Sequence, residues 1–463
     1  MFDNKKKKTY EIDMCHGPLL KKILLFALPL MCSSVLQLLF NAADIVVVGR
    51  CAGENSLAAV GSTSSLINLL TNLFLGLSVG ANVLAARYYG AGQKKELSKT
   101  VHTAMLVSFF SGIILTIFGI LFTRQILIWM STPAEVLTLA ALYLRIYFLG
   151  MTATMIYNFG SALLRAVGDT KRPLYYLMLA GVVNVILNLV FVICFHLDVA
   201  GVAMATAISQ CISAVLVLRC LILEKGGVHL DLKQLKIHRQ ILVKILEIGL
   251  PAGFQGVIFA ISNVVIQASV NGFGATVIAG NSAAANIEGF VYVAMNAFYQ
   301  AAISFVGQNA GAGAYKRVDR IALLCLGCVV VVGVVLGNGV LYLAPQLLSI
   351  YSKKPAVITA GIRRLSIIAS TYALCGVMDV LVGILRGMGY SILPMLVSLM
   401  GACGLRLLWI ATVFQIPRYH EIATVYLSYP ITWTITLSVH LLCFFILRKR
   451  WNTQKIGNRE NEM

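Results

Sequence analysis

Apolar runs of about twenty residues recur along almost the whole 463-residue chain, and they restrict its fold more than any other feature. An α-helix of that length spans the hydrocarbon core of a bilayer. Only 12% of the residues are charged, about half the share of a typical soluble domain. The sequence therefore predicts an all-α integral membrane protein with about twelve transmembrane helices. We place them at approximately 23–48, 57–82, 100–122, 137–158, 173–195, 199–222, 246–269, 276–304, 319–343, 362–385, 391–414 and 422–447.

A formal net charge of +19 would ordinarily suggest a nucleic-acid partner, but the distribution of the charge does not. Most of the 37 Lys and Arg residues fall at the chain ends and in the loops on one side of the predicted helices. Positive residues accumulate on the cytoplasmic loops of membrane proteins. We therefore expect a multi-pass protein of the cell inner (plasma) membrane, with both termini cytoplasmic and no nucleic-acid partner.

Three short motifs of the first half return in the second half at a nearly constant spacing along the chain. The pairs are Leu28-Pro29 with Leu250-Pro251, Gly90-Ala91-Gly92 with Gly311-Ala312-Gly313, and Leu164-Arg165-x-x-Gly168 with Leu385-Arg386-x-x-Gly389. Each half holds an even number of predicted spans, so both halves enter the membrane from the same side as two parallel six-helix repeats. We expect an N-lobe over 1–222, a cytoplasmic linker over 223–245, a C-lobe over 246–447 and a cytoplasmic tail over 448–463.

An acidic residue, Asp44, lies inside the first predicted span. A carboxylate costs roughly 2.5–3.5 kcal/mol to insert into a bilayer on translocon scales, so intramembrane acids indicate function. Counting about 1.5 Å per residue from the predicted outer turns places Asp44, Asn188 and Thr206 at similar depth, with Asn184 one turn deeper. These oxygens would suit a proton or Na⁺. The plainer interpretations are that Asp44 lies at the interface or caps a helix, and that the amides and the hydroxyl hold helices together.

Two further acids, Asp379 and Glu288, lie inside predicted spans and are second candidates for such a site. The alternative for Asp379 is a pair with Arg406 or a hydrogen bond between helices. The alternative for Glu288 is hydrogen bonding to nearby Asn side chains.

Aromatic residues and Met gather in the spans expected to line a cavity, where they would suit bulky cationic ligands through stacking and cation–π contacts. Such stripes are also common in ordinary helix packing. The residues proposed for a substrate cavity are Gln37, Asn41, Tyr292, Met295 and Tyr299.

Several segments together resemble the multidrug and toxic compound extrusion (MATE) family over essentially the whole chain. They are FNAADIVVVGR, the inner-loop GAG, LLRAVGDTKRP, NVILN, GVAMATAIS, GLPAGFQ and FVGQNAGAG. The resemblance implies two six-helix lobes in a V shape, and export of cationic or amphipathic compounds driven by inward flow of H⁺ or Na⁺. It implies a transporter and not an enzyme, with no cofactor beyond the coupling ion, small-molecule substrates, membrane lipids around it, and a monomer as the working unit.

The family's N-lobe cation site falls on Asp44, Asn184, Asn188 and Thr206, which are the metal ligands if the ion is Na⁺. The C-lobe sodium site of some members needs an acid in the seventh span, and no acid follows Pro251 there.

The nearest alternative is a lipid-linked oligosaccharide or lipid flippase of the same superfamily. Such a protein holds a diphosphate with several intramembrane cations, and here we expect only Arg406 and Arg145 to qualify. An integral-membrane prenyl transferase would need paired carboxylates for Mg²⁺ and diphosphate, and no Asp-rich pair lies near a span.

Overall fold

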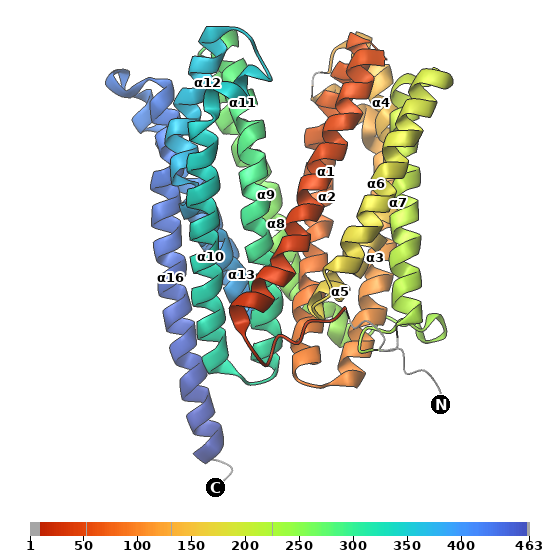
Figure 1. The fold of residues 1–463 in the computed structure, drawn as a ribbon, viewed down its shortest axis with the longest axis vertical. Helices are drawn as coiled ribbons and strands as arrows, with labels where there is room; N and C mark the ends of the chain where they lie inside the picture. The colour runs from red at the N-terminus through yellow and green to blue at the C-terminus, as the bar shows by residue number, and fades with distance from the viewer. Residues whose placement is uncertain (1–9, 52, 131, 225, 461–463) are drawn as a thin grey trace. The chain divides into compact units, whose positions relative to one another are not determined.

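The computed structural model describes residues 10–51, 53–130, 132–224 and 226–460 of the chain. Every regular element in these residues is helical, and none is a β-strand. Eleven helices there are long and apolar enough to cross a membrane, or twelve when the bent pair Ala134–Leu149 and Met151–Ala166 counts as one span. The predicted all-α membrane class and the approximate number of spans are confirmed (Figure 1).

The helices of the first half extend beyond the predicted spans at most of their ends. They are α1 Leu19–Cys51, α2 Glu54–Gly90, α3 Lys94–Trp129, α4 Ala134–Leu149, α5 Met151–Ala166, α6 Lys171–Leu189 with a π-helical continuation η1 Val190–Cys194, and α7 Asp198–Leu223. The predicted single span 137–158 is instead two helices, α4 and α5, bent by 46° at Gly150. A Cβ atom at Gly150 would lie 3.0 Å from the Cα atom of Ala207, so the bend needs glycine to approach α7.

The second half repeats this order of helices. Its elements are η2 Leu232–Gln234, α8 Arg239–Asn271, α9 Ala275–Gly311, α10 Tyr315–Tyr342, α11 Ala344–Ser349, α12 Pro355–Ile368, η3 Ala369–Thr371, α13 Tyr372–Gly387, α14 Ile392–Ser398, the π-helical η4 Leu399–Leu405, α15 Arg406–Ala411, η5 Val413–Gln415, η6 Pro417–Tyr419 and α16 Ile422–Glu460. Helix α9 repeats α2 and helix α13 repeats α5, with the same displacement along the sequence at all four helix ends.

The backbone carries the same repeat. Gly92 and Gly313 have φ angles of 68° and 69°, and Gly168 and Gly389 have φ angles of 94° and 95°. Positive φ is easily adopted only by glycine, so the repeated glycines of these loops have a structural reason. The internal repeat predicted from three motifs is therefore visible in helix ends and in loop conformation.

The contacts divide the chain into two compact units. Unit 1 comprises Met1–Gly253 and Gly307–Val318, and unit 2 comprises Phe254–Val306 and Asp319–Met463. The division falls inside α8, α9 and α10. Helix α8 begins within the predicted linker, and α16 continues through most of the predicted tail. The lobe boundaries at 222 and 246 stay a prediction.

Glycines bring α2 and the first half of α8 together within unit 1. A Cβ atom at Gly249 would lie 2.6 Å from the Cα atom of Leu77, and one at Gly76 or Gly80 would collide with the backbone of α8. Gly249 and Gly253, like Gly76 and Gly80, are spaced as in the small-xxx-small pattern of close membrane-helix pairs.

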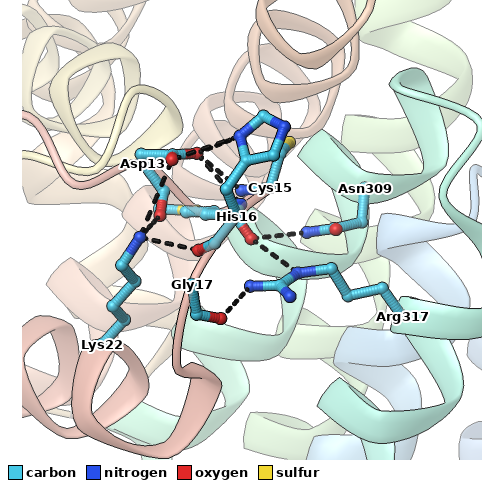
Figure 2. Close-up of polar contacts among 8 residues, drawn as sticks. Asp13, Cys15, His16, Gly17, Lys22, Asn309 and Arg317 are labelled. Atoms are coloured by element: carbon cyan, nitrogen blue, oxygen red, sulfur yellow. Dashed lines mark hydrogen bonds and ion pairs between the residues drawn. The ribbon is translucent and has the colours of Figure 1, made fainter.

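The segment before α1 folds against the C-terminal end of α9 and the start of α10, all within unit 1 (Figure 2). The Met14 side chain is fully buried, and its carbonyl accepts hydrogen bonds from Asn309 Nδ2 at 3.0 Å and Arg317 Nε at 3.4 Å. Arg317 Nη2 also donates to the Gly17 carbonyl at 2.8 Å. Lys22 Nζ donates to the carbonyls of Asp13 and His16 at 2.6 and 2.7 Å. We call residues 10–17 the N-terminal strap.

Candidate functional site

Four polar side chains from three helices of unit 1 are joined by three hydrogen bonds, and we call them the Asp44 ring. Asn188 Nδ2 donates both to Asp44 Oδ1 and, at 3.2 Å, to Asn184 Oδ1. Asn184 Nδ2 donates to Thr206 Oγ1 at 3.3 Å, and Thr206 lies close enough to Asp44 to interact with it. The structure thus brings together α1, α6 and α7 through the four residues predicted by depth counting. Their role in ion coupling stays a prediction.

The ring lies within the protein, and its carboxylate does not sit at the end of its own helix. Asn188 is fully buried, Asn184 is 5% exposed and Asp44 is 9% exposed. Asp44 is followed by two further turns of α1, which rules out the interpretation that it caps that helix. Asn188 directly precedes the last α-helical residue of α6, after which the π-helical η1 begins. Single-turn π segments interrupt α-helices most often at functional sites.

Small residues let the helices around the ring approach closely. A Cβ atom at Gly181 of α6 would collide with the Phe40 ring of α1. Val48 of α1 and Val199 and Val202 of α7 are buried in one hydrophobic cluster with residues of α4. The helices that carry the ring are therefore packed closely against one another.

One hydrogen-bond acceptor of the ring has no donor. The NH₂ group of Asn188 donates to two acceptors, but its carbonyl oxygen Oδ1 is buried without a hydrogen-bond partner. Buried polar atoms are normally satisfied, so an orphan of this kind calls for an explanation. An unpaired carbonyl oxygen beside a carboxylate is a chemistry that attracts a proton donor or a hard cation.

Two tyrosines of α4, Tyr143 and Tyr147, lie near the ring and were not predicted from the sequence as part of the site. Both lie close enough to Asp44 to interact with its charge, and their rings are stacked with centroids 6.0 Å apart. Their spacing of four residues on one predicted span was the available signal, because it places both rings on one helix face.

Glu288, a second candidate, is paired with a cation. Arg364 Nη2 donates to its Oε2 at 2.7 Å and Arg364 Nε to its Oε1 at 3.1 Å, while Arg364 Nη1 donates to Asn281 at 2.8 Å. Both side chains are less than a tenth exposed. The partner is therefore an arginine, where the sequence suggested amides, and the geometry favours a structural role for Glu288.

Asp379, the other second candidate, lies on α13 beside the Tyr292 hydroxyl and interacts with Arg386, not with Arg406. Arg386 itself donates to the Tyr299 hydroxyl and, at 2.8 Å, to Gln255. The alternative interpretation of an Asp379–Arg406 pair is not met among the residues that the structure describes.

The residues proposed for a substrate cavity fall into two groups. Gln37, Asn41 and Tyr292 are exposed at the surface of their helices. Met295 and Tyr299 are buried, because α13 packs against them at Gly376 and Gly383. A cavity role stays a prediction for all five.

The expected set of intramembrane cations, Arg406 and Arg145, leaves out two buried arginines of unit 2. Arg145 is exposed, whereas Arg364 and Arg386 are 8% and 4% exposed and join Arg406 inside unit 2. Within residues 10–460, apart from the undescribed positions, no group of three or more His, Cys, Asp or Glu could hold a metal ion.

Comparison with known proteins identifies relatives along the whole chain. A family model described as MatE matches twice, over residues 29–190 and 251–412. The chain is 27% identical over 441 residues to "Probable multidrug resistance protein YoeA" of Bacillus subtilis (strain 168), covering 93% of this chain and 94% of the relative. It is 28% identical over 394 residues to "Probable multidrug resistance protein YpnP" of the same organism, covering 85% and 88%.

The fold also matches solved structures. One is described as the outward-facing conformation of a multidrug resistance MATE family transporter of the MOP superfamily. It superposes with a TM-score of 0.90 at 21% identity, covering 97% of this chain and all of that chain. The two matches of the family model begin at Pro29 and Pro251, the prolines of the first repeated motif, which agrees with the internal repeat.

Proposed function

This chain belongs to the MATE family, and from that premise we propose that it is a secondary active efflux antiporter. It exports cationic or amphipathic compounds in exchange for H⁺ or Na⁺ by alternating access, with both termini in the cytoplasm. The relatives named as multidrug resistance proteins support this substrate class.

The observation that carries the proposal is the orphan oxygen of Asn188 next to the buried Asp44 carboxylate. A buried anion and an unsatisfied acceptor both lower their free energy when a proton or a small cation enters. The site is thus built to hold one positive charge.

Alternating access follows from what the bound charge changes. With the ion present, Asp44 is neutralised and α1 packs against α6 and α7 at low cost. Without it, the charged carboxylate favours an arrangement in which water reaches the ring. Pro29 has no backbone N–H to give to the helix, so α1 can bend there as the ring is loaded and emptied.

The test is transport of a cationic dye by membrane vesicles that contain the full-length protein. The pH gradient and the Na⁺ gradient are collapsed separately, for the wild type and for Asp44→Asn. We expect the wild type to lose export when one gradient is removed, which identifies the ion, and Asp44→Asn to lose gradient-driven export altogether.

Asp198→Asn is the matched control. It removes an exposed carboxylate at the first residue of α7. The backbone of Asp198 is left-handed, with φ of 44°, and Asn adopts this conformation readily. It should export at the wild-type rate. Export against a gradient by Asp44→Asn would overturn the coupling role, and absence of dye transport under every gradient would overturn multidrug export.

A further inference from the structure

The N-terminal strap, residues 10–17, contacts the first repeat through its beginning. The Tyr89 hydroxyl, near the end of α2, donates to Glu11 Oε2 at 3.1 Å. A Cβ atom at Gly168, in the loop before α6, would lie 2.6 Å from the backbone nitrogen of Ile12. The backbone of the strap therefore packs directly on the helix ends of its own repeat.

The second repeat holds the other end of the strap (Figure 2). Asn309 Nδ2, on α9, donates to the Met14 carbonyl at 3.0 Å. Arg317, on α10, donates to the carbonyls of Met14 and Gly17. The Met14 side chain is fully buried. The strap thus bridges helices that belong to different repeats, and all of these residues lie within unit 1.

Next to the strap, the ends of α2 and α5 are in direct contact with the end of α9. Gln308, the residue before Asn309, donates from Nε2 to the Ala166 carbonyl at 2.7 Å. A Cβ atom at Gly307 would lie 3.1 Å from the Cβ atom of Ala86, which is fully buried. Separation of these helix ends would therefore expose Ala86 to water.

The second repeat has a segment equivalent to the strap. Residues 231–238 hold the places before α8 that residues 10–17 hold before α1. The backbone N–H of His238 donates to Thr103 Oγ1 at 3.1 Å. Thr103 lies on α3, and Arg317 lies on the equivalent helix of the second repeat, α10. Each segment thus forms hydrogen bonds to the same helix of the other repeat.

The two segments differ in how they are tethered. Residues 231–238 connect α7 to α8, so helices hold this segment at both ends. The strap is joined to a described helix only through α1, where Lys22 donates to the carbonyls of Asp13 and His16. Its hydrogen bonds to the second repeat come from side chains, so they can exchange for water without any change in a helix.

We propose that the N-terminal strap is a latch that holds the ends of α2 and α9 together. It leaves Asn309 and Arg317 when the protein opens toward the side of the membrane that carries the N-terminus, and it stays on the first repeat. This inference rests on the proposed alternating access. Because α1 carries both the strap and Asp44, loading of the ring and release of the latch act on one helix.

The test measures how fast the thiol of Ala86→Cys reacts with N-ethylmaleimide in the detergent-purified full-length protein. Peptide mass spectrometry follows this position and Cys15 in the same sample. We expect slow labelling at position 86 when the strap is intact. Adding Arg317→Ala should accelerate it about tenfold, because lost hydrogen bonds from a charged group shift the opening equilibrium at least that far.

Two further variants separate the strap from other effects at α10. Met14→Ala loosens the strap itself and leaves Arg317 in place, so it should also accelerate labelling at position 86. Arg320→Ala removes an exposed arginine of α10 and should leave the rate unchanged. If Ala86→Cys alone reacts like an unfolded thiol, hydrogen exchange over residues 83–90 in proteins that keep Ala86 decides, with the same order of rates expected.

Transport supplies a readout that simple damage to the fold would not produce. A loosened latch raises the fraction of molecules open toward the N-terminal side, which lowers the apparent KM for dye on that side. The maximal export rate should fall as well, because closure then starts from a more stable open state. We expect Arg317→Ala to lower both quantities, and Arg320→Ala to change neither. Local damage would lower the maximal rate without lowering KM.

Two results would overturn the latch. One is faster labelling of Cys15 by Arg317→Ala or Met14→Ala without faster labelling or exchange around position 86, since the strap would then open alone. The other is an unchanged or higher KM for Arg317→Ala. A wild type that transports no dye would overturn the proposed function instead. The labelling experiment needs no transport, so the two failures are distinguishable.

Discussion

Glu288 and Arg364 neutralise each other inside unit 2, whereas Arg363, the preceding residue, forms an exposed pair with Glu421 at 2.9 Å. The side chains of the first pair are 5% and 9% exposed, and those of the second are 58% and 50% exposed. Breaking a buried pair leaves an uncompensated charge and costs about 3–5 kcal/mol, whereas exposed pairs contribute about 0–1 kcal/mol.

We therefore expect Glu288→Gln to lower the free energy of unfolding by about 3–5 kcal/mol, because Arg364 loses its counter-charge. Glu421→Gln is the matched control and should cost less than about 1 kcal/mol. Denaturant unfolding of the purified protein in detergent measures both. Equal effects of the two substitutions would mean that the buried pair contributes no more than a surface contact.

The residues at the Asp44 ring could be predicted, and those around Glu288 could not, for one physical reason. Depth counting works when the turn between two spans is recognisable, as for Asn188 and Thr206 on either side of the turn at 195–197, and here it worked although the five residues of η1 between Asn188 and that turn are π-helical. Arg364 instead resembled a loop cation at the edge of a span. Its burial depends on how α12 packs against α9 and α16, which no local pattern encodes.

At the scale of elements, the N-terminal strap depends on a few polar contacts. Arg317 holds the carbonyls of Met14 and Gly17, and the thiol of Cys15 lies between these two residues. Burial raises the pKa of Cys15, and the charge of Asp13 adds to this, whereas the charge of Arg317 lowers it. Only the thiolate reacts with maleimides, so the strap can be followed through this residue.

We expect Arg317→Ala to accelerate maleimide labelling of Cys15 about tenfold, because losing hydrogen bonds from a charged group releases about 1.5–3 kcal/mol of local stability. Removing the positive charge by itself would raise the pKa further and slow the reaction, so acceleration must come from opening of the strap. Labelling of Cys15 is quantified by peptide mass spectrometry.

Arg320→Ala provides the control, because Arg320 is exposed one turn further along α10. It should leave the labelling rate unchanged. In the wild type, the labelling rate should increase with pH. The midpoint of this increase should lie at a higher pH than in the unfolded chain, because the folded thiol has the higher pKa. A slower or unchanged rate in Arg317→Ala would mean that the strap is held by other contacts.

Element positions followed well from apolar length, because a span must match the bilayer. Their ends did not, since α2 and α9 continue for 37 residues each, well past the hydrocarbon thickness. The bend between α4 and α5 was also missed. Gly150 allows it, but the contact with Ala207 that uses it joins helices distant in the sequence.

At the scale of the whole molecule, the two repeats meet in a reciprocal contact. A Cβ atom at Gly90, at the end of α2, would collide with the Gln308 backbone, and one at Gly311, at the end of α9, would collide with the Arg87 backbone. Gly311 and Gln308 hold the same places in the second repeat as Gly90 and Arg87 hold in the first. Such exchange of equivalent residues is the signature of a two-fold relation.

The motif repeat alone predicted equivalent halves but not this contact. Sequence spacing gives the offset between Gly90 and Gly311, and the turn glycines Gly92 and Gly313 account for the loops that follow. The contact of each helix end with the other repeat forms only when the helices pack together. Positions that differ between the two repeats, such as Asp379, likewise could not be predicted from the repeated motifs.

The reciprocal contact makes a prediction about additivity. Gly90→Ala and Gly311→Ala should each lower the free energy of unfolding by about 1–3 kcal/mol, because a methyl group enters a space occupied by backbone. The double variant should lose less free energy of unfolding than the sum of the two single losses, because the first methyl group already separates the two helix ends and leaves room for the second. Gly327→Ala, which meets open space on α10, is the control and should be neutral or slightly stabilising. Denaturant unfolding of the wild type and the four variants in one detergent measures these values. Strictly additive effects would show that the two glycines pack independently, and the helix ends of the two repeats would then not act as one joint.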